Sequence, residues 1–304
     1  MASVLLAAKV AAASTVRVRD LVSGPARPAD VLGRFATGLY LRLAGGEVIA
    51  LLSSDAVRLP IGLILPTSSR EFPLSHLTGR VMVGSGAVQV GDWSCRIARL
   101  ISPRAPAGLT PDLGACEHLR HRLSKCASQD LDLHLPDPLP ECALSLSKGT
   151  VRASTSVVLS LRKGAAHMIT HSPDSAAELV RQLLGAGPGL TPAGDDLLAG
   201  LLVGLWSFGQ RADALRLAVL ARLPAGTTDL SAALLRCALR GESIPQVNRL
   251  LRVLSGNAWQ SRLDKAVDDL IHVGHTSGTA LATGVWAAAA MAIGDRRWVL
   301  VDAN

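Results

Sequence analysis

Short apolar runs separated by turn residues fill the first 105 residues of the chain. Leu39, Leu41 and Leu43 alternate with more polar neighbours, and a Gly-Gly pair separates them from the apolar run 48–52, so we expect these segments to form a β-hairpin. Six or seven such strands at regular spacing predict a small antiparallel sandwich or barrel. The other segments with strand character are 16–22, 61–65, 80–83, 87–90 and 94–101.

The last 139 residues, 166–304, have longer apolar segments with the spacing of helices. We therefore predict an α+β protein, in which a β domain of residues 1–105 precedes an all-α domain of residues 166–304. The longest apolar runs, 197–208 and 281–293, are too short for a membrane span and predict buried helices. The expected helices cover 176–184, 197–208, 212–223, 229–240, 244–255, 261–273 and 279–292, with a short tail at 298–301.

A segment of different character, residues 106–165, connects the two predicted domains. It contains a predicted helix at 112–127, followed by three prolines between 136 and 140 that favour a linker. The sequence Leu-Ser-Leu-Ser-Lys-Gly at 144–149 recurs as Leu-Ser-Leu-Arg-Lys-Gly at 159–164. We interpret residues 141–165 as a poorly ordered repeat insertion without catalytic residues, and a strand pair is the alternative.

The most distinctive stretch is the glycine-rich segment 185–204, which leads from a predicted loop into an apolar helix. Thr191 suits the N-cap and Pro192 the first helical position, while Asp195 and Asp196 fall in the first turn, where the helix dipole is positive. A loop of this kind can present backbone N–H groups to an anion. The alternative interpretation is a capped helix with a tight preceding turn and no ligand.

A second loop repeats this pattern. Residues 273–284 contain Gly278-x-x-Leu-x-x-Gly284, which matches Gly194-x-x-Leu-x-x-Gly200, and each copy follows a threonine and begins an apolar helix. Gly200, Gly204 and Gly284 lower helix propensity by about 1 kcal/mol each, so we expect close backbone packing to compensate. Two facing helix N-termini would form a pocket with several free N–H groups for a phosphate or carboxylate.

Several polar residues could contribute to this pocket. His275 could assist as a proton donor, although a single histidine is often structural. Asp195 and Asp196 point about 100° apart on a helix, so at most one should face the pocket, and the other could cap the helix or hold Mg²⁺ through water. Between the loops, Thr228 suits an N-cap with Ser231 at the capping-box position.

Composition narrows the classes of function. The net charge is +7, but the basic residues are scattered, which disfavours a nucleic-acid surface and suits small anionic substrates. The five cysteines are irregularly spaced, which indicates a reducing cytoplasmic compartment and no zinc site. The apolar stretch 4–13 is a poor match to a signal peptide. The motifs of serine hydrolases, Walker A proteins and zinc proteases are absent from the sequence.

The motif Gly-x-Gly-Leu-Thr-Pro-x-Gly-Asp-Asp at 187–196, with Thr-Thr-x-x-Ser at 227–231 and Gly-His-Thr-Ser-Gly at 274–278, resembles a bacterial family of oxamate carbamoyltransferase subunits from anaerobic allantoin degradation. The segment 59–62, Leu-Pro-Ile-Gly, is also similar to a recurrent family segment, so the resemblance covers most of the chain apart from about 105–165. In the second loop this chain has Ala280, where family members often carry an acid.

The resemblance implies carbamoyl transfer between oxamate and carbamoyl phosphate, performed together with other protein subunits. We expect the glycine loop and Thr191 to bind phosphate, an acid to orient the substrate or Mg²⁺, and His275 to stabilise an oxyanion. The second hypothesis is a non-catalytic subunit that binds an anion or a partner protein. Candidate catalytic residues are Asp195, Asp196 and His275, and candidate substrate-binding residues are Gly187, Gly189, Leu190, Thr191, Gly194, Thr228, Ser231, Gly274, Thr276, Ser277 and Gly278.

Overall fold

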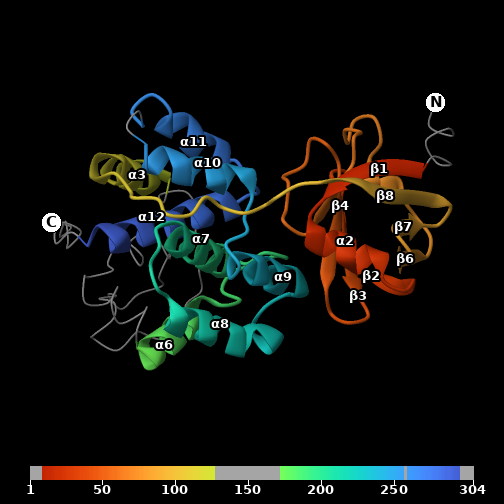
Figure 1. The fold of residues 1–304 in the computed structure, drawn as a ribbon, viewed down its shortest axis with the longest axis horizontal. Coiled ribbons are helices and arrows are strands. Elements are labelled where there is room, and N and C mark those ends of the chain that lie inside the picture. The colour runs from red at the N-terminus through yellow and green to blue at the C-terminus, as the bar shows by residue number, and fades with distance from the viewer. Residues whose placement is uncertain (1–8, 127–171, 257–258, 295–304) are drawn as a thin grey trace. The chain divides into compact units, whose positions relative to one another are not determined.

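A computed structural model describes residues 9–126, 172–256 and 259–294 of the chain. The chain divides into two compact units, Met1–Pro103 and Arg104–Asn304 (Figure 1). The first contains the β-strands, and the described residues of the second form helices and loops, so the structure confirms a β region followed by a helical region. The predicted repeat insertion at 141–165 and the tail at 298–301 lie outside the described residues.

The N-terminal unit is a closed barrel with the strand order β1-β5-β4-β3-β2-β6-β7-β8. The predicted hairpin is present, because β3 pairs antiparallel with β4 and places Leu41 opposite Ile49. The expectation of a purely antiparallel sheet is wrong: β1 is parallel to β8, and β4 is parallel to β5. The strands are β1 (Lys9–Ser14), β2 (Arg27–Arg34), β3 (Gly38–Leu43), β4 (Val48–Leu52), β5 (Gly62–Ile64), β6 (Val81–Gly84), β7 (Ala87–Val90) and β8 (Trp93–Leu100).

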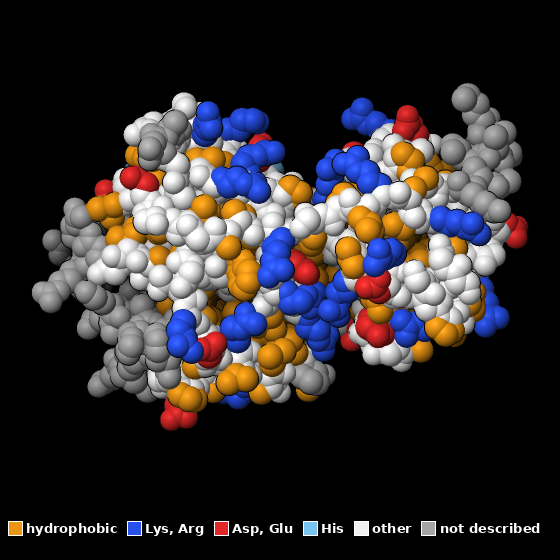
Figure 2. Space-filling model, in the orientation of Figure 1, with side chains coloured by type: hydrophobic (Ala, Val, Ile, Leu, Met, Phe, Trp, Pro, Cys, Tyr) orange, Lys and Arg blue, Asp and Glu red, His pale blue; other side chains and the backbone are white. Residues whose placement is uncertain are grey.

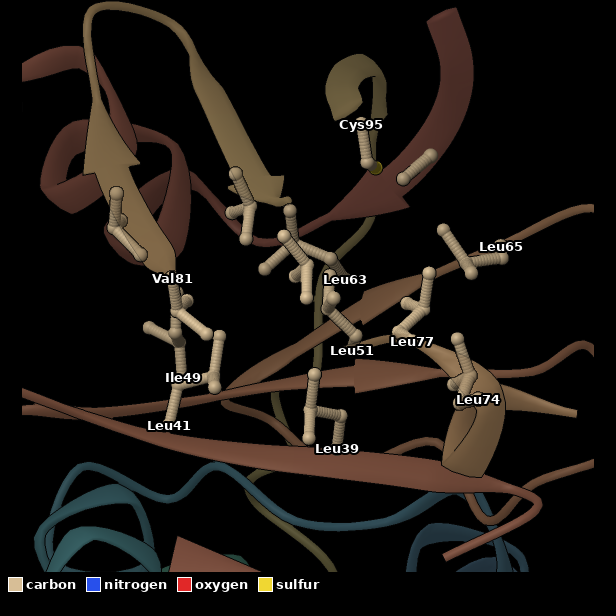
Figure 3. Close-up of a cluster of buried hydrophobic side chains, with 14 of the residues drawn as sticks. Leu39, Leu41, Ile49, Leu51, Leu63, Leu65, Leu74, Leu77, Val81 and Cys95 are labelled. Carbon is tan, nitrogen blue, oxygen red and sulfur yellow. The ribbon is translucent and has the colours of Figure 1, made fainter. Parts of the chain in front are cut away.

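The barrel interior is filled by the inward-facing side chains of these strands. Leu39 and Leu41 from β3 lie beside Ile49 and Leu51 from β4, and all four are fully buried (Figure 3). Leu74 lies in the short 3₁₀ helix η1 (Leu74–His76) and packs into the same core. The alternation that predicted the hairpin therefore also defines which side chains fill the barrel.

The segment predicted as a strand at 16–22 is instead the helix α2 (Val16–Ser23). Thr15 caps the helix by accepting a hydrogen bond from the Val18 N–H. Val18 and Val22 are both buried, at the i, i+4 spacing of a helix, whereas Val16 is half exposed. The alternation of valine and arginine suggested a strand because the spacing of Val18 and Val22, four residues apart, fits both periods.

Two strands of the barrel were missed in the sequence. Half of the residues of β1 are alanine, and among the described side chains of β1 only Ala12 reaches the barrel core as a fully buried apolar side chain. β2 contains Pro28, Asp30 and Gly33, which are residue types depleted in strands. Both strands therefore depend on pairing with the neighbouring strands of the barrel rather than on their own β propensity.

The C-terminal unit consists, in its described parts, of packed helices whose positions match the predicted ones closely. Most ends differ from the prediction by one to four residues, which is the usual uncertainty of helix ends. None of the described helices is long and apolar enough to cross a membrane. The helices are α3 (Leu113–Cys126), α6 (Pro173–Leu183), α7 (Ala193–Ser207), α8 (Asp213–Gly226), α9 (Asp229–Ala238), α10 (Pro245–Leu254), α11 (Leu263–Ile271) and α12 (Ser277–Ile293).

Helices α7 and α12 form the most extensive contact between described elements, and both are buried almost along their whole length. A Cβ atom added at Gly200 of α7 would lie 2.2 Å from the Leu281 carbonyl oxygen. A Cβ atom added at Gly284 of α12 would lie 2.2 Å from the Leu197 carbonyl oxygen. The two helices thus cross with their backbones in reciprocal contact, which confirms the compensation expected for these glycines.

Charged side chains lie mainly on the surface of each unit, and several basic groups have an acidic side chain beside them (Figure 2). Within the helical unit, Arg122 of α3 binds Asp264 of α11 at 2.7 Å and also bonds to Asp268. Such exposed pairs contribute little to stability individually, at most about 1 kcal/mol. They do neutralise part of the positive charge that the composition shows.

Candidate functional site

Three loops meet at the beginning of α7, whereas the sequence predicted a pocket between the first and the third. The first connects α6 to α7, the second precedes α9, and the third precedes α12. Thr228 in the second loop donates a hydrogen bond of 2.6 Å to the Leu190 carbonyl in the first. The Thr191 and Ser277 hydroxyls lie 3.3 Å apart and join the first loop to the beginning of α12.

The start of α7 differs by one residue from the prediction. Pro192 occupies the N-cap position in an extended conformation and supplies no side-chain hydrogen bond. Thr191 lies one residue before the cap, so its hydroxyl faces Ser277 instead of the first turn of its own helix. The cap predicted at Thr228 is confirmed, because its side chain accepts a hydrogen bond of 3.1 Å from the Ser231 N–H.

The two matching glycines pack their loops in the same way. A Cβ atom at Gly194 would lie 2.0 Å from the Leu183 carbonyl oxygen, and one at Gly278 would lie 1.9 Å from the Leu270 carbonyl oxygen. The N–H groups of these glycines bond to Ala186 and Val273, both at 2.9 Å. Gly194 and Gly278 are therefore structural residues. The sequence had suggested that their amides bind an anion, but both amides are already bonded within the protein.

Other amides of the two first turns are also occupied. The N–H groups of Asp195 and Asp196 both donate to the Pro192 carbonyl, at 3.0 and 3.2 Å. Within the part of the chain that the structure describes, the amides of Ala193, Ser277 and Thr279 have no hydrogen-bond acceptor. Within the first turns of the two helices, the free backbone donors are therefore these three.

Asp195 holds the loops together. Its side chain is 1% exposed, and its carboxyl accepts hydrogen bonds from the Gly185 N–H at 2.8 Å and from the Thr227 hydroxyl. Burial raises its pKa, while the hydrogen bonds from Thr227, Gly185 and Ser231 oppose that rise. Thr227 was missed in the sequence because its neighbour Thr228 is the better N-cap candidate, although the doubled threonine was visible.

Asp196 lies on the side of α7 that faces the third loop. It is 7% exposed, and its Oδ2 atom is buried without a hydrogen-bond partner in the described structure. Burial raises the pKa of Asp196 to about 7, an effect that the Ser277 hydroxyl opposes and the neighbouring Asp195 reinforces. The two adjacent acids therefore point to different loops, as their spacing on a helix requires.

The remaining predicted site residues surround this cluster unequally. Ser277 is half-buried beside Asp196 and Thr191 is half-buried beside Ser277, whereas Gly274 and His275 are exposed. His275 has no hydrogen bond or ion pair with any residue that the structure describes. Ser231 is 2% exposed and stabilises the Asp195 carboxylate.

The other four residues lie in the loops or at the cap of α12. Gly187 and Gly189 adopt φ angles of 115° and 91° in the first loop, and Leu190 contributes its carbonyl to Thr228. Thr276 is the N-cap of α12 but makes no side-chain cap hydrogen bond.

Comparison with known families identifies the part of the chain that contains this arrangement. Residues 183–289 match the family described as oxamate carbamoyltransferase subunit AllH. The match confirms the family that the loop motifs predicted. No solved structure matches the chain significantly.

The AllH match begins at Leu183, whose carbonyl packs against Gly194, and ends inside α12. It contains all three loops, the complete helices α7 to α11 and most of α12, but leaves the barrel unit outside. The family segment predicted at 59–62 is therefore not covered and stays a prediction.

The chemistry available at the AllH-like site is hydrogen bonding rather than ion pairing. Neither Asp195 nor Asp196 forms an ion pair with a described residue. Among the residues that the structure describes, no group of three or more metal-ligating side chains occurs. Two hydroxyls, three backbone amides and one carboxyl remain to contact a ligand, a set that suits the oxygen atoms of a small anion.

Proposed function

We propose that this chain is a subunit of a carbamoyltransferase and that Thr191, Asp196 and Ser277 bind its small anionic substrate, of the carbamoyl phosphate or oxamate type. The observation that carries the proposal is the buried, unpartnered Oδ2 atom of Asp196, whose carboxyl interacts with the Ser277 hydroxyl, which in turn lies 3.3 Å from the Thr191 hydroxyl of another loop. These residues lie within the range that matches the AllH family.

The proposed roles follow from the hydrogen-bonding capacity of each group. The Thr191 and Ser277 hydroxyls and the amides of Ala193, Ser277 and Thr279 can donate to phosphate or carboxylate oxygens. The N-terminal ends of α7 and α12 add positive partial charge, which favours an anion.

Carbamoyl transfer requires a positioned donor, a positioned acceptor and stabilisation of the charge that develops on the carbonyl oxygen. The exposed His275 beside the third loop is the candidate for that oxyanion contact. We assign Asp195 to positioning, because both of its oxygens are occupied within the protein.

A second candidate function is a non-catalytic subunit that binds the anion and contributes to assembly with other subunits. The occupied amides of Gly194 and Gly278 favour it, since they leave fewer donors than a complete transition-state site usually presents. Both functions use the same cluster, and only turnover separates them.

The test combines binding with turnover. The chain is purified with the products of its neighbouring genes, and carbamoyl phosphate formation from oxalurate and phosphate is measured. Calorimetry on the isolated chain with carbamoyl phosphate, oxamate and phosphate measures binding. Binding with turnover supports the first function, binding without turnover in the presence of the partners supports the second, and absence of binding contradicts both.

Two variants test the site itself. Ser277→Ala should weaken anion binding by about tenfold, because a hydrogen bond to a charged group contributes about 1.5 kcal/mol. Ser207→Ala is the matched control, since Ser207 is a buried serine at the opposite end of α7. Equal affinities of the two variants would remove Ser277 from the proposed site.

A further inference from the structure

The protonation state of Asp196 is the open question at the proposed site. A carboxylate that is buried without a cation or sufficient hydrogen-bond donors is strongly disfavoured, and it either binds a proton or is paired with a ligand. The Oδ2 atom of Asp196 meets this condition, because it is buried and has no partner among the described residues.

The surroundings of Asp196 favour the neutral acid. The charged group that acts on it is Asp195, which is itself an acid on the same helix. From α12 the facing group is the neutral Ser277 hydroxyl, and the nearby His275 is exposed and makes no contact with Asp196. From α9 the titratable residue at the helix start is Asp229, and from α6 it is Glu178, which binds Arg181. None of these groups supplies a cation to Asp196.

We propose that Asp196 binds the ligand as a carboxylic acid, donating its Oδ2 proton to a carboxylate or phosphate oxygen that the Thr191 and Ser277 hydroxyls also contact. This inference rests on the proposed function, because it requires that the cluster binds an oxyanion. No bond between heavy atoms forms or breaks: where Asp196 is ionised in the free protein, its carboxylate takes up one proton from solvent on binding and forms the O–H group that donates to the ligand.

The proposal also defines the specificity of the position. An acid O–H is a donor, so it recognises an acceptor oxygen and disfavours an amide NH₂ group at the same place. With oxamate, the carboxylate end should therefore face Asp196 and the amide end should face away. A cation site would behave oppositely, because Mg²⁺ requires the ionised carboxylate and would release the proton.

The experiment is calorimetry of the full chain with oxamate, and separately with inorganic phosphate, at pH 6, 7 and 8. Each titration is repeated in two buffers with different ionisation enthalpies, which gives the number of protons taken up. Since the pKa of Asp196 is about 7, we expect almost one proton at pH 8 and few at pH 6. The affinity for oxamate should fall about fivefold between pH 7 and pH 8 through this group, because the protonated fraction falls from about one half to about one tenth.

The Asp196→Asn variant isolates the residue, because asparagine keeps the shape and a hydrogen-bond donor but cannot titrate. It should bind oxamate with the same affinity at all three pH values and without proton uptake at this position. Subtracting the variant from the natural chain removes the titration of phosphate itself and of the other groups that the two chains share. Ser277→Ala should bind more weakly but retain the proton uptake, and thermal unfolding monitored by circular dichroism verifies that both variants fold.

The outcomes separate the two proposals. Proton uptake that occurs with the natural chain but not with Asp196→Asn supports the inference. The anion that binds more tightly, oxamate or phosphate, is then the preferred source of the oxyanion. Binding with the same uptake in both chains overturns the inference and leaves the proposed function intact. Affinity that requires Mg²⁺ and increases with pH also overturns it, in favour of a cation site. If neither anion binds, both proposals fail together.

Discussion

Two adjacent residues of the same type have different tasks at the start of α7. Asp195 is satisfied by Gly185 and Thr227, whereas Asp196 retains a buried oxygen without a partner. Environment rather than residue type separates them, as in other sites where one of two carboxyls is held neutral. The distinction makes separate predictions for stability and for ligand binding.

Asp196→Asn should stabilise the protein at high pH. The pKa of Asp196 is about 7 in the folded protein against an ordinary aspartate value of 3.8, so the natural chain loses stability as the pH rises from about 4 to about 7. At 1.36 kcal/mol per unit, the variant should gain up to about 4 kcal/mol above pH 7 and little at pH 4. Urea unfolding followed by helical circular dichroism measures this difference. The exposed Asp213→Asn should change stability by less than about 0.5 kcal/mol throughout.

Asp195→Ala should have the opposite effect. It leaves the Gly185 N–H and the Thr227 hydroxyl without their acceptor, which should cost about 3 kcal/mol in unfolding free energy at pH 7. The same urea experiment tests it, with Asp196→Ala as the comparison on the neighbouring residue. If Asp195→Ala is as stable as Asp196→Ala, then Asp195 is not the residue that holds the loops.

At the scale of elements, the crossing of α7 and α12 determines the geometry of the site. Gly200 and Gly284 allow the two backbones to touch, and this contact brings the starts of both helices together. The matching positions of the two helices are not chemically equal, because Ala280 stands where the motif alignment places Asp196. The site therefore has one acidic side.

Gly200→Ala and Gly284→Ala should each destabilise the helical unit. Alanine favours a helix by about 1 kcal/mol, but the added methyl group would overlap a carbonyl oxygen, so we expect a net loss of about 2 kcal/mol or more. Thermal unfolding monitored by circular dichroism measures the effect. In Gly24→Ala the nearest atom lies 3.7 Å away, so this control should remain near the natural stability.

The helices of the second unit could be predicted because each has its own periodic apolar face and polar breaks. The loops were found from their glycines and hydroxyl residues, and the contact between Thr191 and Ser277 agrees with the facing loops expected. The direction of each hydroxyl was less predictable. Helix α7 begins one residue later than expected, so Thr191 contacts Ser277 instead of capping the helix. The occupied amides of Gly194 and Gly278 depend on carbonyls in the preceding segments, which local pattern does not reveal.

The barrel was harder to predict than the helices, because its pairing is non-local. β2 contains residues unfavourable to strands, and the parallel pairing of β1 with β8 connects segments more than 80 residues apart. Alternation along one strand identifies its inner face but not its neighbours. The hairpin of β3 and β4 was predictable because its partners are adjacent in the sequence.

At the scale of the whole molecule, the two units carry separate cores, and the AllH match covers only part of the helical one. Ala12→Asp tests the barrel core independently of the site. Ala12 of β1 is 2% exposed, so a carboxylate there would be buried without a partner and should unfold the barrel. The fluorescence of Trp93, which is buried in that core, reports the loss. Ala11→Asp is the control, since Ala11 is exposed on the neighbouring position of the same strand.

The closure of the barrel by β1 has a consequence for how the protein folds during synthesis. β1 comprises residues 9–14, but its partners are β5 at 62–64 and β8 at 93–100. During translation the strand must wait for about 90 further residues, which requires several seconds at 5–20 residues per second. Until β8 emerges, the edges of β1 and β7 that pair with it have no partner, and this interval is when the chain depends most on protection from aggregation.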